Sequence, residues 1–239
     1  MATFVLVHGG GHGGWCYSRL AKVLRGMGHE VHCPTLTGLG DRRHLLRPGT
    51  DLDTHIEDVL ALLFHEDLRD VYLAGHSYGG MVITGVADRA LDRVGHLIFL
   101  DAAHPRDGES LHEIARGQMS MASQFMVVVN DVECFYLPDE MAGPAYGVTD
   151  PADFAWMKPR LAPHPWASIT QPLRLANEAA VMALARTSIN CTPTLAVRPK
   201  EYLHRTLEAD HLFEIDTGHD LMITEPEAVA KMLDQVTRN

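Results

Sequence analysis

The sequence predicts an α/β fold, with a mostly parallel sheet of about six strands covered by helices. Short apolar runs alternate with helical patterns through the first hundred residues, as in successive βαβ units. This alternation stops near Pro105 and returns after about Asn190. We therefore expect one domain with a core of residues 1–103 and 192–239. A helical cap or lid, residues 104–191, is inserted after the strand that ends near Asp101.

The individual core elements follow from local patterns. Continuous apolar runs indicate buried strands, and apolar residues repeating every three or four positions indicate helices. The expected strands are residues 3–9, 30–36, 71–75, 96–105, 192–198 and 211–218. The expected helices are residues 15–28, 51–65, 79–92 and 225–236, the first of which ends at a glycine.

Composition and charge exclude several classes of protein. The 239 residues carry a formal net charge of −11, which argues against a nucleic-acid partner. No apolar run approaches the ~20 residues that span a bilayer. Four widely spaced cysteines and the lack of a basic leader predict a cytoplasmic protein. The 15 histidines form no HExxH pattern and join no CxxC pair, so we expect no metal site.

The segment VYLAGHSYGGM predicts a nucleophile. Gly75 and Gly79 flank Ser77 at minus two and plus two, where a strand turns abruptly into a helix. At such a turn the apex residue is strained, and its neighbours must lack side chains because strand and helix press together. The turn holds a serine hydroxyl above the sheet at a helix N-terminus, where developing negative charge is favoured.

The partners of this serine are expected from chain order. A base must remove the hydroxyl proton, and in this arrangement the histidine follows the last strand, where His219 lies. Two backbone N–H groups must also bind the developing oxyanion. We expect them from Tyr78, directly after the nucleophile, and from Gly10 in the glycine-rich loop HGGGHGGW after the first strand.

These motifs together resemble the α/β-hydrolase superfamily. More narrowly, FVLVHGGGHGGWCY, GHSYGGM and TGHDLMITEPE are similar to the branch of plant methylesterases, hydroxynitrile lyases and small bacterial esterases. The resemblance implies a cofactor-free serine hydrolase with a helical cap over an apolar pocket.

Two residues are candidates for the acid that would complete a catalytic triad with Ser77 and His219. In many relatives an aspartate follows the strand before the last, but the chain there has Glu201 and no aspartate. Asp101 ends the strand after the turn, where some lipases of the superfamily carry their acid. We favour Asp101 and keep Glu201 as the alternative; either would orient His219.

We expect hydrolysis of a small hydrophobic carboxylic ester through an acyl-enzyme; a carbamate, amide or lactone would use the same residues. The alternatives are a non-catalytic small-ligand receptor of this fold, and a hydroxynitrile-lyase-like or tailoring lyase. Hydroxynitrile lyases of this branch carry a lysine that holds cyanide where this chain has Asp220, and a threonine where it has Gly10. An anionic Asp220 would repel cyanide, which favours hydrolysis.

Methionine and aromatic side chains of the cap are expected to form an adaptable apolar pocket. The residues are Met119, Met121, Phe125, Phe154, Trp156 and Met157. A homodimer through the lid is a further expectation.

Overall fold

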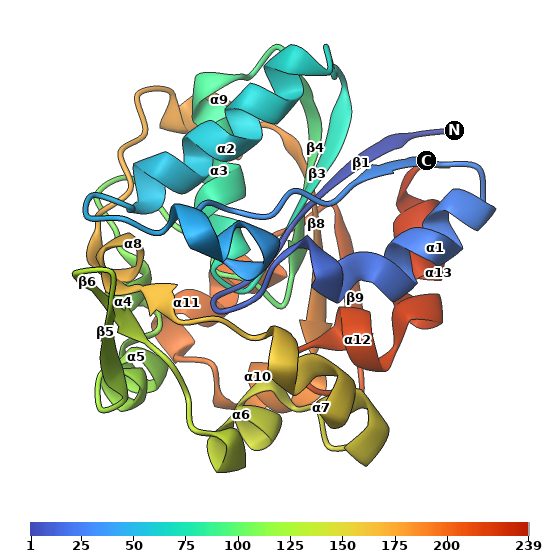
Figure 1. The fold of residues 1–239 in the computed structure, drawn as a ribbon. Coiled ribbons are helices and arrows are strands. Elements are labelled where there is room, and N and C mark those ends of the chain that lie inside the picture. Colours follow the sequence, from blue (N-terminus) through green and yellow to red (C-terminus); the bar gives the residue numbers. More distant parts are fainter. Residues whose placement is uncertain (239) are drawn as a thin grey trace.

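A computed structural model describes residues 1–238 and shows a six-stranded parallel sheet (Figure 1). Its strand order is β2-β1-β3-β4-β8-β9, and every neighbouring pair is parallel. The strands are β1 (Thr3–Val7), β2 (Glu30–His32), β3 (Val71–His76), β4 (Val94–Leu100), β8 (Ala185–Cys191) and β9 (His211–Ile215). The predicted fold class is confirmed.

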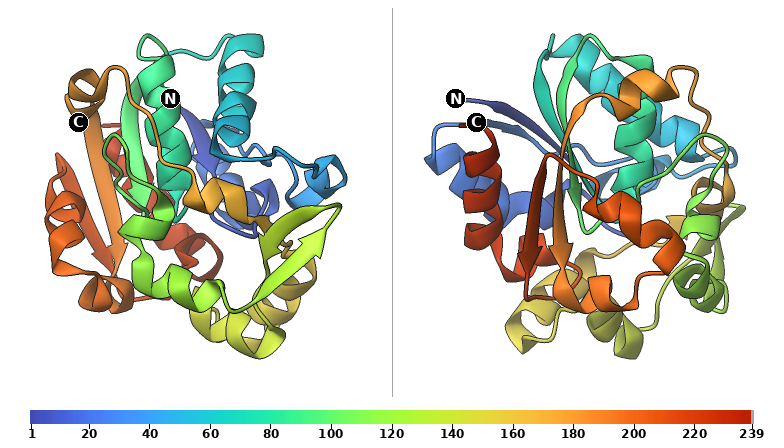
Figure 2. Two further views of the ribbon diagram at one scale, coloured as in Figure 1. Left: turned by 90° about the vertical axis from the view of Figure 1, so that its left-hand side faces the viewer. Right: turned by 180° about the vertical axis from the view of Figure 1, so that it is seen from behind.

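Helices cover both faces of this sheet (Figure 2). The core helices are α1 (Ser18–Gly26), α2 (Leu52–His65), α3 (Gly79–Arg89), α9 (Glu178–Met182), α10 (Thr192–Val197), α11 (Lys200–Leu207), α12 (Leu221–Thr224) and α13 (Pro226–Val236). Strand β1 shows the two-sided burial. Phe4 and Leu6 pack into the cluster that contains residues of α1 and α13, whereas Val5 and Val7 pack with residues of α2 and α3. Alternate side chains of this buried parallel strand thus pack on opposite faces of the sheet.

One strand lies elsewhere than predicted. The segment TPTLAVR, expected as a strand, forms helix α10, and the strand is the preceding segment ARTSINC, which is β8. Pro193 at the start of α10 suits the first turn of a helix, where its missing N–H is not needed. The central sheet therefore resumes at Ala185, before the expected return to the core at residue 192.

Residues 111–170 form a segment between β4 and β8 that lies beyond the carboxyl ends of the strands, at the bottom of Figure 1, whereas α9 lies near the opposite end of the sheet. This segment is not purely helical as expected, because it also holds a three-stranded antiparallel sheet, β5-β6-β7. Its elements are α4 (Leu111–Ile114), α5 (Arg116–Ala122), β5 (Met126–Val129), β6 (Val132–Phe135), α6 (Asp139–Tyr146), α7 (Pro151–Met157), β7 (His164–Pro165) and α8 (Trp166–Thr170). We keep the name cap for this segment. Within residues 1–238, every helix is too short or too polar to cross a membrane.

Candidate active site

Ser77 occupies the sharp turn between β3 and α3. Its backbone is left-handed, with φ of +53°, a conformation that is uncommon for residues other than glycine. A Cβ added at Gly75 would lie 2.5 Å from the carbonyl oxygen of Gly79, and one added at Gly79 would lie 2.6 Å from that of Val7. Both glycines are therefore required by close backbone approach: Gly75 to the start of the helix, and Gly79 to the neighbouring strand β1.

His219 and Asp101 form a close pair at the carboxyl ends of the strands. His219 follows β9 and Asp101 follows β4, and the Nδ1 atom of the histidine lies 2.6 Å from Oδ2 of the carboxylate. The Asp101 side chain is fully buried, whereas the His219 side chain is 21% exposed. The other carboxylate oxygen, Oδ1, lies 3.3 Å from a guanidinium nitrogen of Arg198.

These contacts shift both pKa values. Burial acts to raise the pKa of Asp101, but the hydrogen bond and charge of His219, followed by the charge of Arg198, hold that pKa below its ordinary value. For His219, burial acts to lower the pKa, and the hydrogen bond and charge of Asp101 outweigh it, so the pKa is raised. The pair thus favours a positively charged imidazole, the form that a general base reaches after it accepts a proton.

A cavity of about 440 Å³ brings the candidate groups together. Ser77, Asp101 and His219 line it, and so do Gly10 and Tyr78. Within residues 1–238, the backbone N–H groups of Gly10 and Tyr78 donate no hydrogen bond to another protein group. Two free N–H donors beside a serine are the arrangement that an oxyanion hole requires.

The cap contributes an apolar wall to this cavity that differs in part from the expected one. Met119 and Met121 line the cavity as expected. The other four expected residues do not line it: Phe125, Phe154, Trp156 and Met157. Three of them pack helix α7 onto the core instead. Met157 is fully buried there, and Trp156 meets the ring of Trp15 edge-on at 5.4 Å.

Several lining residues were missed in the sequence. The larger ones are Leu111, Ile114, Phe135, Leu137, Tyr146, Ile169, Arg198 and Tyr202. They come from several different elements and loops, and no sequence motif marks them. The antiparallel strand β6, which carries Phe135, was itself not expected.

Glu201 and Asp220 both lie away from the cavity lining. Glu201 is exposed on α11, so the alternative acid is separated from the pair described above. Asp220 is fully buried, and its carboxylate lies 2.9 Å from Nε2 of His12. Its carboxylate therefore contacts a buried histidine and does not line the cavity, although its charge raises the pKa of the adjacent His219.

The described residues bring together no group of three His, Cys, Asp or Glu side chains that could hold a metal ion. The pair, the turn and the two free N–H groups thus meet at one cavity at the carboxyl ends of the strands.

Comparison with known proteins identifies the family. The chain belongs to the alpha/beta hydrolase family, whose model matches residues 4–232. A carbendazim hydrolyzing esterase of Nocardioides sp. (strain SG-4G) is 37% identical over 98% of each chain. Methylesterase 18 of Arabidopsis thaliana is 33% identical over 50% of this chain and 46% of its own length. The chain is thus a carboxylesterase-like enzyme. The crystal structure of a methylesterase from Arabidopsis shares the fold, with a TM-score of 0.81, 21% identity, and coverage of 100% of this chain and 99% of that one.

Proposed function

We propose that this protein hydrolyses small hydrophobic carboxylic esters through an acyl-enzyme on Ser77. The observation that carries the proposal is the 2.6 Å pair of His219 and Asp101 in the wall of the cavity that also contains Ser77. A serine hydroxyl becomes a nucleophile when a base removes its proton, and His219 is the base at this cavity.

In this mechanism the Ser77 oxygen attacks the ester carbonyl while His219 accepts the hydroxyl proton. The carbonyl oxygen gains negative charge, which the N–H groups of Gly10 and Tyr78 stabilise. His219 then donates its proton to the departing alcohol, which leaves an acyl group on Ser77. Water, deprotonated by the same histidine, releases the acid and restores the serine. Asp101 stays ionised and stabilises the imidazolium in both steps.

The cavity wall supports a hydrophobic substrate. Apart from the groups named above, its cap-derived lining is mainly aliphatic and aromatic, including Leu111, Ile114, Phe135 and Ile169. A volume of about 440 Å³ lies in the range of small-molecule sites. Because the relative in Nocardioides is named for carbendazim hydrolysis, carbendazim is a substrate to test beside simple esters.

The first test is the hydrolysis of a p-nitrophenyl ester series, followed over many turnovers. We expect sustained turnover that Ser77→Ala abolishes and that Ser18→Ala, the same chemical change at an exposed position of α1, preserves. Labelling with a fluorophosphonate should add one adduct per chain, located on Ser77 by mass spectrometry.

Other outcomes would favour the alternatives. A single burst without recycling would favour a receptor that keeps the hydrolase fold. Products that contain no added water would favour a lyase. Equal rates in Ser77→Ala and the parent would exclude the acyl-enzyme.

A further inference from the structure

The cap holds the loop that carries Gly10. This loop follows β1, and Gly10 supplies one of the two N–H groups at the catalytic cavity. The next residue, buried Gly11, donates its backbone N–H to Nδ1 of His164 at 3.2 Å, and its carbonyl oxygen accepts from the backbone N–H of Ala162 at 2.8 Å. His164 lies 153 residues further along the chain, in strand β7 of the cap. Two hydrogen bonds therefore connect the cap to the residue directly after Gly10.

The hydrogen bonds of His164 determine which ring nitrogen accepts. The Ser168 hydroxyl donates to the carbonyl oxygen of Pro165 at 2.8 Å, and its oxygen lies 2.8 Å from Nε2 of His164. Because the hydroxyl proton is used, this oxygen can only accept from Nε2–H, which leaves Nδ1 as the acceptor for Gly11. Burial first, and then the charges of neighbouring histidines, hold the pKa of His164 well below its ordinary value, so the ring stays neutral in ester assays.

Two further buried histidines contact the same loop. His8 donates from Nδ1 to the oxygen of Gly9, and His12 donates from Nδ1 to the oxygen of Gly10, each at 2.8 Å. The oxygen of Gly9 and the N–H of Gly10 belong to one planar peptide group, so these contacts orient the proposed oxyanion donor. His8 and His12 come from the loop or its start, whereas His164 is the contact that the cap supplies.

The His164 ring also lies beside the second proposed donor. It meets the ring of Tyr78 edge-on, at 4.8 Å between centroids. A Cβ added at Gly10 would lie 3.9 Å from the His164 ring. The imidazole is fully buried and does not line the catalytic cavity, although its register partner Phe135 does. His164 therefore contacts the residues of the proposed oxyanion hole from behind, without contacting the substrate space.

We propose that His164 is a positioning residue for the oxyanion hole, whose Nδ1 atom holds Gly11 so that the Gly10 N–H points at the developing oxyanion. This inference rests on the proposed hydrolysis. Without Nδ1, the buried Gly11 N–H would lack an acceptor, which is unfavourable, and the glycine-rich loop would shift to find another. Oxyanion donors act on the transition state, so a shifted loop should slow the chemical step and leave substrate binding unchanged.

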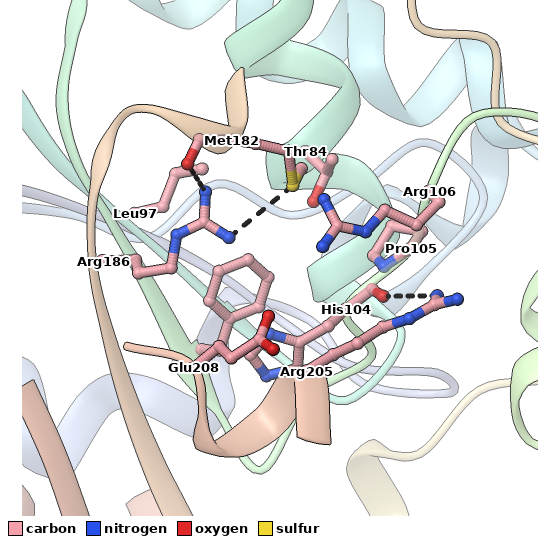
Figure 3. Close-up of a pocket in the computed structure, with 10 residues that line it drawn as sticks. Thr84, Leu97, His104, Pro105, Arg106, Met182, Arg186, Arg205 and Glu208 are labelled. Atoms are coloured by element: carbon pink, nitrogen blue, oxygen red, sulfur yellow. Dashed lines mark hydrogen bonds between the residues drawn. The ribbon is translucent and has the colours of Figure 1, made fainter. Parts of the chain in front are cut away.

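Buried His104 offers a matched control position. Figure 3 shows it among the residues that line a small cavity, which shares no residue with the catalytic cavity. His104 is 8% exposed, its ring stacks on that of Phe99, and its Nε2 atom has no hydrogen-bond partner among the described residues. His104→Leu therefore removes a buried imidazole, as His164→Leu does, but removes no acceptor from the Gly10 loop.

Steady-state hydrolysis of p-nitrophenyl esters separates the acceptor from the bulk of the side chain. Leucine and asparagine have the same branched shape, but only asparagine has an oxygen close to the place of Nδ1. For His164→Leu we expect kcat to fall by about 10–100-fold, less than the complete loss of an oxyanion donor, with KM within about threefold of the parent. His164→Asn should recover kcat to within about fivefold of the parent. His104→Leu should keep the kcat of the parent.

Amide hydrogen exchange measures the hold on the loop without catalysis. In protein with isotope-labelled glycine, NMR follows Gly11 and, as a reference, Gly85 within helix α3. Relative to Gly85, exchange at Gly11 should accelerate about tenfold in His164→Leu and return toward the parent rate in His164→Asn.

The two measurements distinguish the possible failures. If the parent hydrolyses no ester, the proposed function fails and the positioning role fails with it, whereas exchange still decides whether His164 holds the loop. If the parent hydrolyses esters, the positioning role is overturned by equal Gly11 exchange in the parent and His164→Leu. It is also overturned if the leucine and asparagine variants lose kcat equally, or if the loss appears in KM alone.

Discussion

Replacing Asp101 with asparagine removes the negative charge beside His219 and keeps the size of the side chain. The carboxylate is fully buried and lies 2.6 Å from Nδ1 of the histidine. In the transition state of the proposed reaction, the imidazole carries a positive charge that this carboxylate stabilises. The Asp101→Asn variant would leave that charge without its partner.

The magnitude of the loss follows from this geometry. Removing one partner of a buried ion pair costs about 3–5 kcal/mol. Each 1.36 kcal/mol of barrier is about tenfold in rate, so kcat should fall by about 10²–10⁴-fold. The upper end is expected, because an asparagine amide can also hold the imidazole in the wrong tautomer, and that change costs about 10⁴-fold in serine proteases.

The pH dependence should change in a defined direction. The proposed mechanism requires neutral His219, so kcat/KM of the parent should rise with pH through the pKa of this group. That pKa is raised by Asp101 against the effect of burial. Without the carboxylate, burial prevails and the pKa falls. The small residual activity of Asp101→Asn should therefore reach its plateau at a lower pH than the activity of the parent.

The assay is p-nitrophenyl ester hydrolysis between about pH 5 and 9, with folding checked by thermal unfolding. Glu201→Gln is the matched control, because it neutralises the alternative acid at an exposed position. Its rate and pH profile should equal those of the parent. The reasoning is refuted if Asp101→Asn keeps more than about a tenth of the rate with an unchanged pH profile, or if Glu201→Gln loses activity.

Three further predictions concern charge, packing and specificity. Arg198→Gln removes a cation that lowers the pKa of His219, the proposed base, so the acid limb of kcat/KM should move to higher pH; a move to lower pH contradicts this. Gly80→Ala places a Cβ 2.0 Å from a backbone carbonyl oxygen and should lower Tm by about 6–12 °C. In the control Gly117→Ala the added Cβ meets nothing within 4 Å, so Tm should stay unchanged or rise by about 2 °C. Equal Tm shifts in the two variants would contradict this prediction. Phe135→Ala should shift the preferred acyl chain to greater length, and Phe154→Ala, outside the cavity lining, should only lower Tm.

The sequence locates the candidate site residues Ser77, His219 and Asp101 better than it locates the elements around them. Gly75 and Gly79 lie two residues before and two residues after Ser77, and at both positions the backbone packs too closely against other backbone atoms for any residue except glycine. Strand β8 was missed because its buried positions include Thr187, Ser188 and Asn190, which are polar residues. An apolar run marks a strand that packs against hydrophobic neighbours, and β8 departs from that rule.

The cavity lining was predicted poorly for a different reason. Met119 and Phe154 both belong to the cap and have the same apolar character. Whether a cap side chain faces the cavity or the core depends on the path of the chain between α5 and α8. No periodicity distinguishes the two outcomes: Phe154 packs against the core cluster, whereas Phe135, on a short strand, reaches the cavity.

The position of His219 depends on segments far from it in the sequence. Its backbone oxygen lies 3.0 Å from Nε2 of buried His76, next to the candidate nucleophile. The following residue, Asp220, donates its backbone N–H to the oxygen of Tyr146 at 2.9 Å, and its carboxylate is bonded to His12 in the first glycine-rich loop. The turn, the first loop and the cap thus all hold the loop that carries the candidate base.

The contact between the cap and the loop that carries His219 involves backbone atoms as well as side chains. Helix α6 ends at Tyr146, and the next residue, Gly147, has a left-handed φ of +68° and lies against Gly218. A Cβ on Gly218 would lie 2.0 Å from the carbonyl oxygen of Gly147, so a side chain there would force the two segments apart. Tyr146 lines the catalytic cavity one residue before this contact. A displacement of α6 would therefore move His219 together with the cavity wall, because the same few residues of the cap define the substrate cavity and hold the histidine loop.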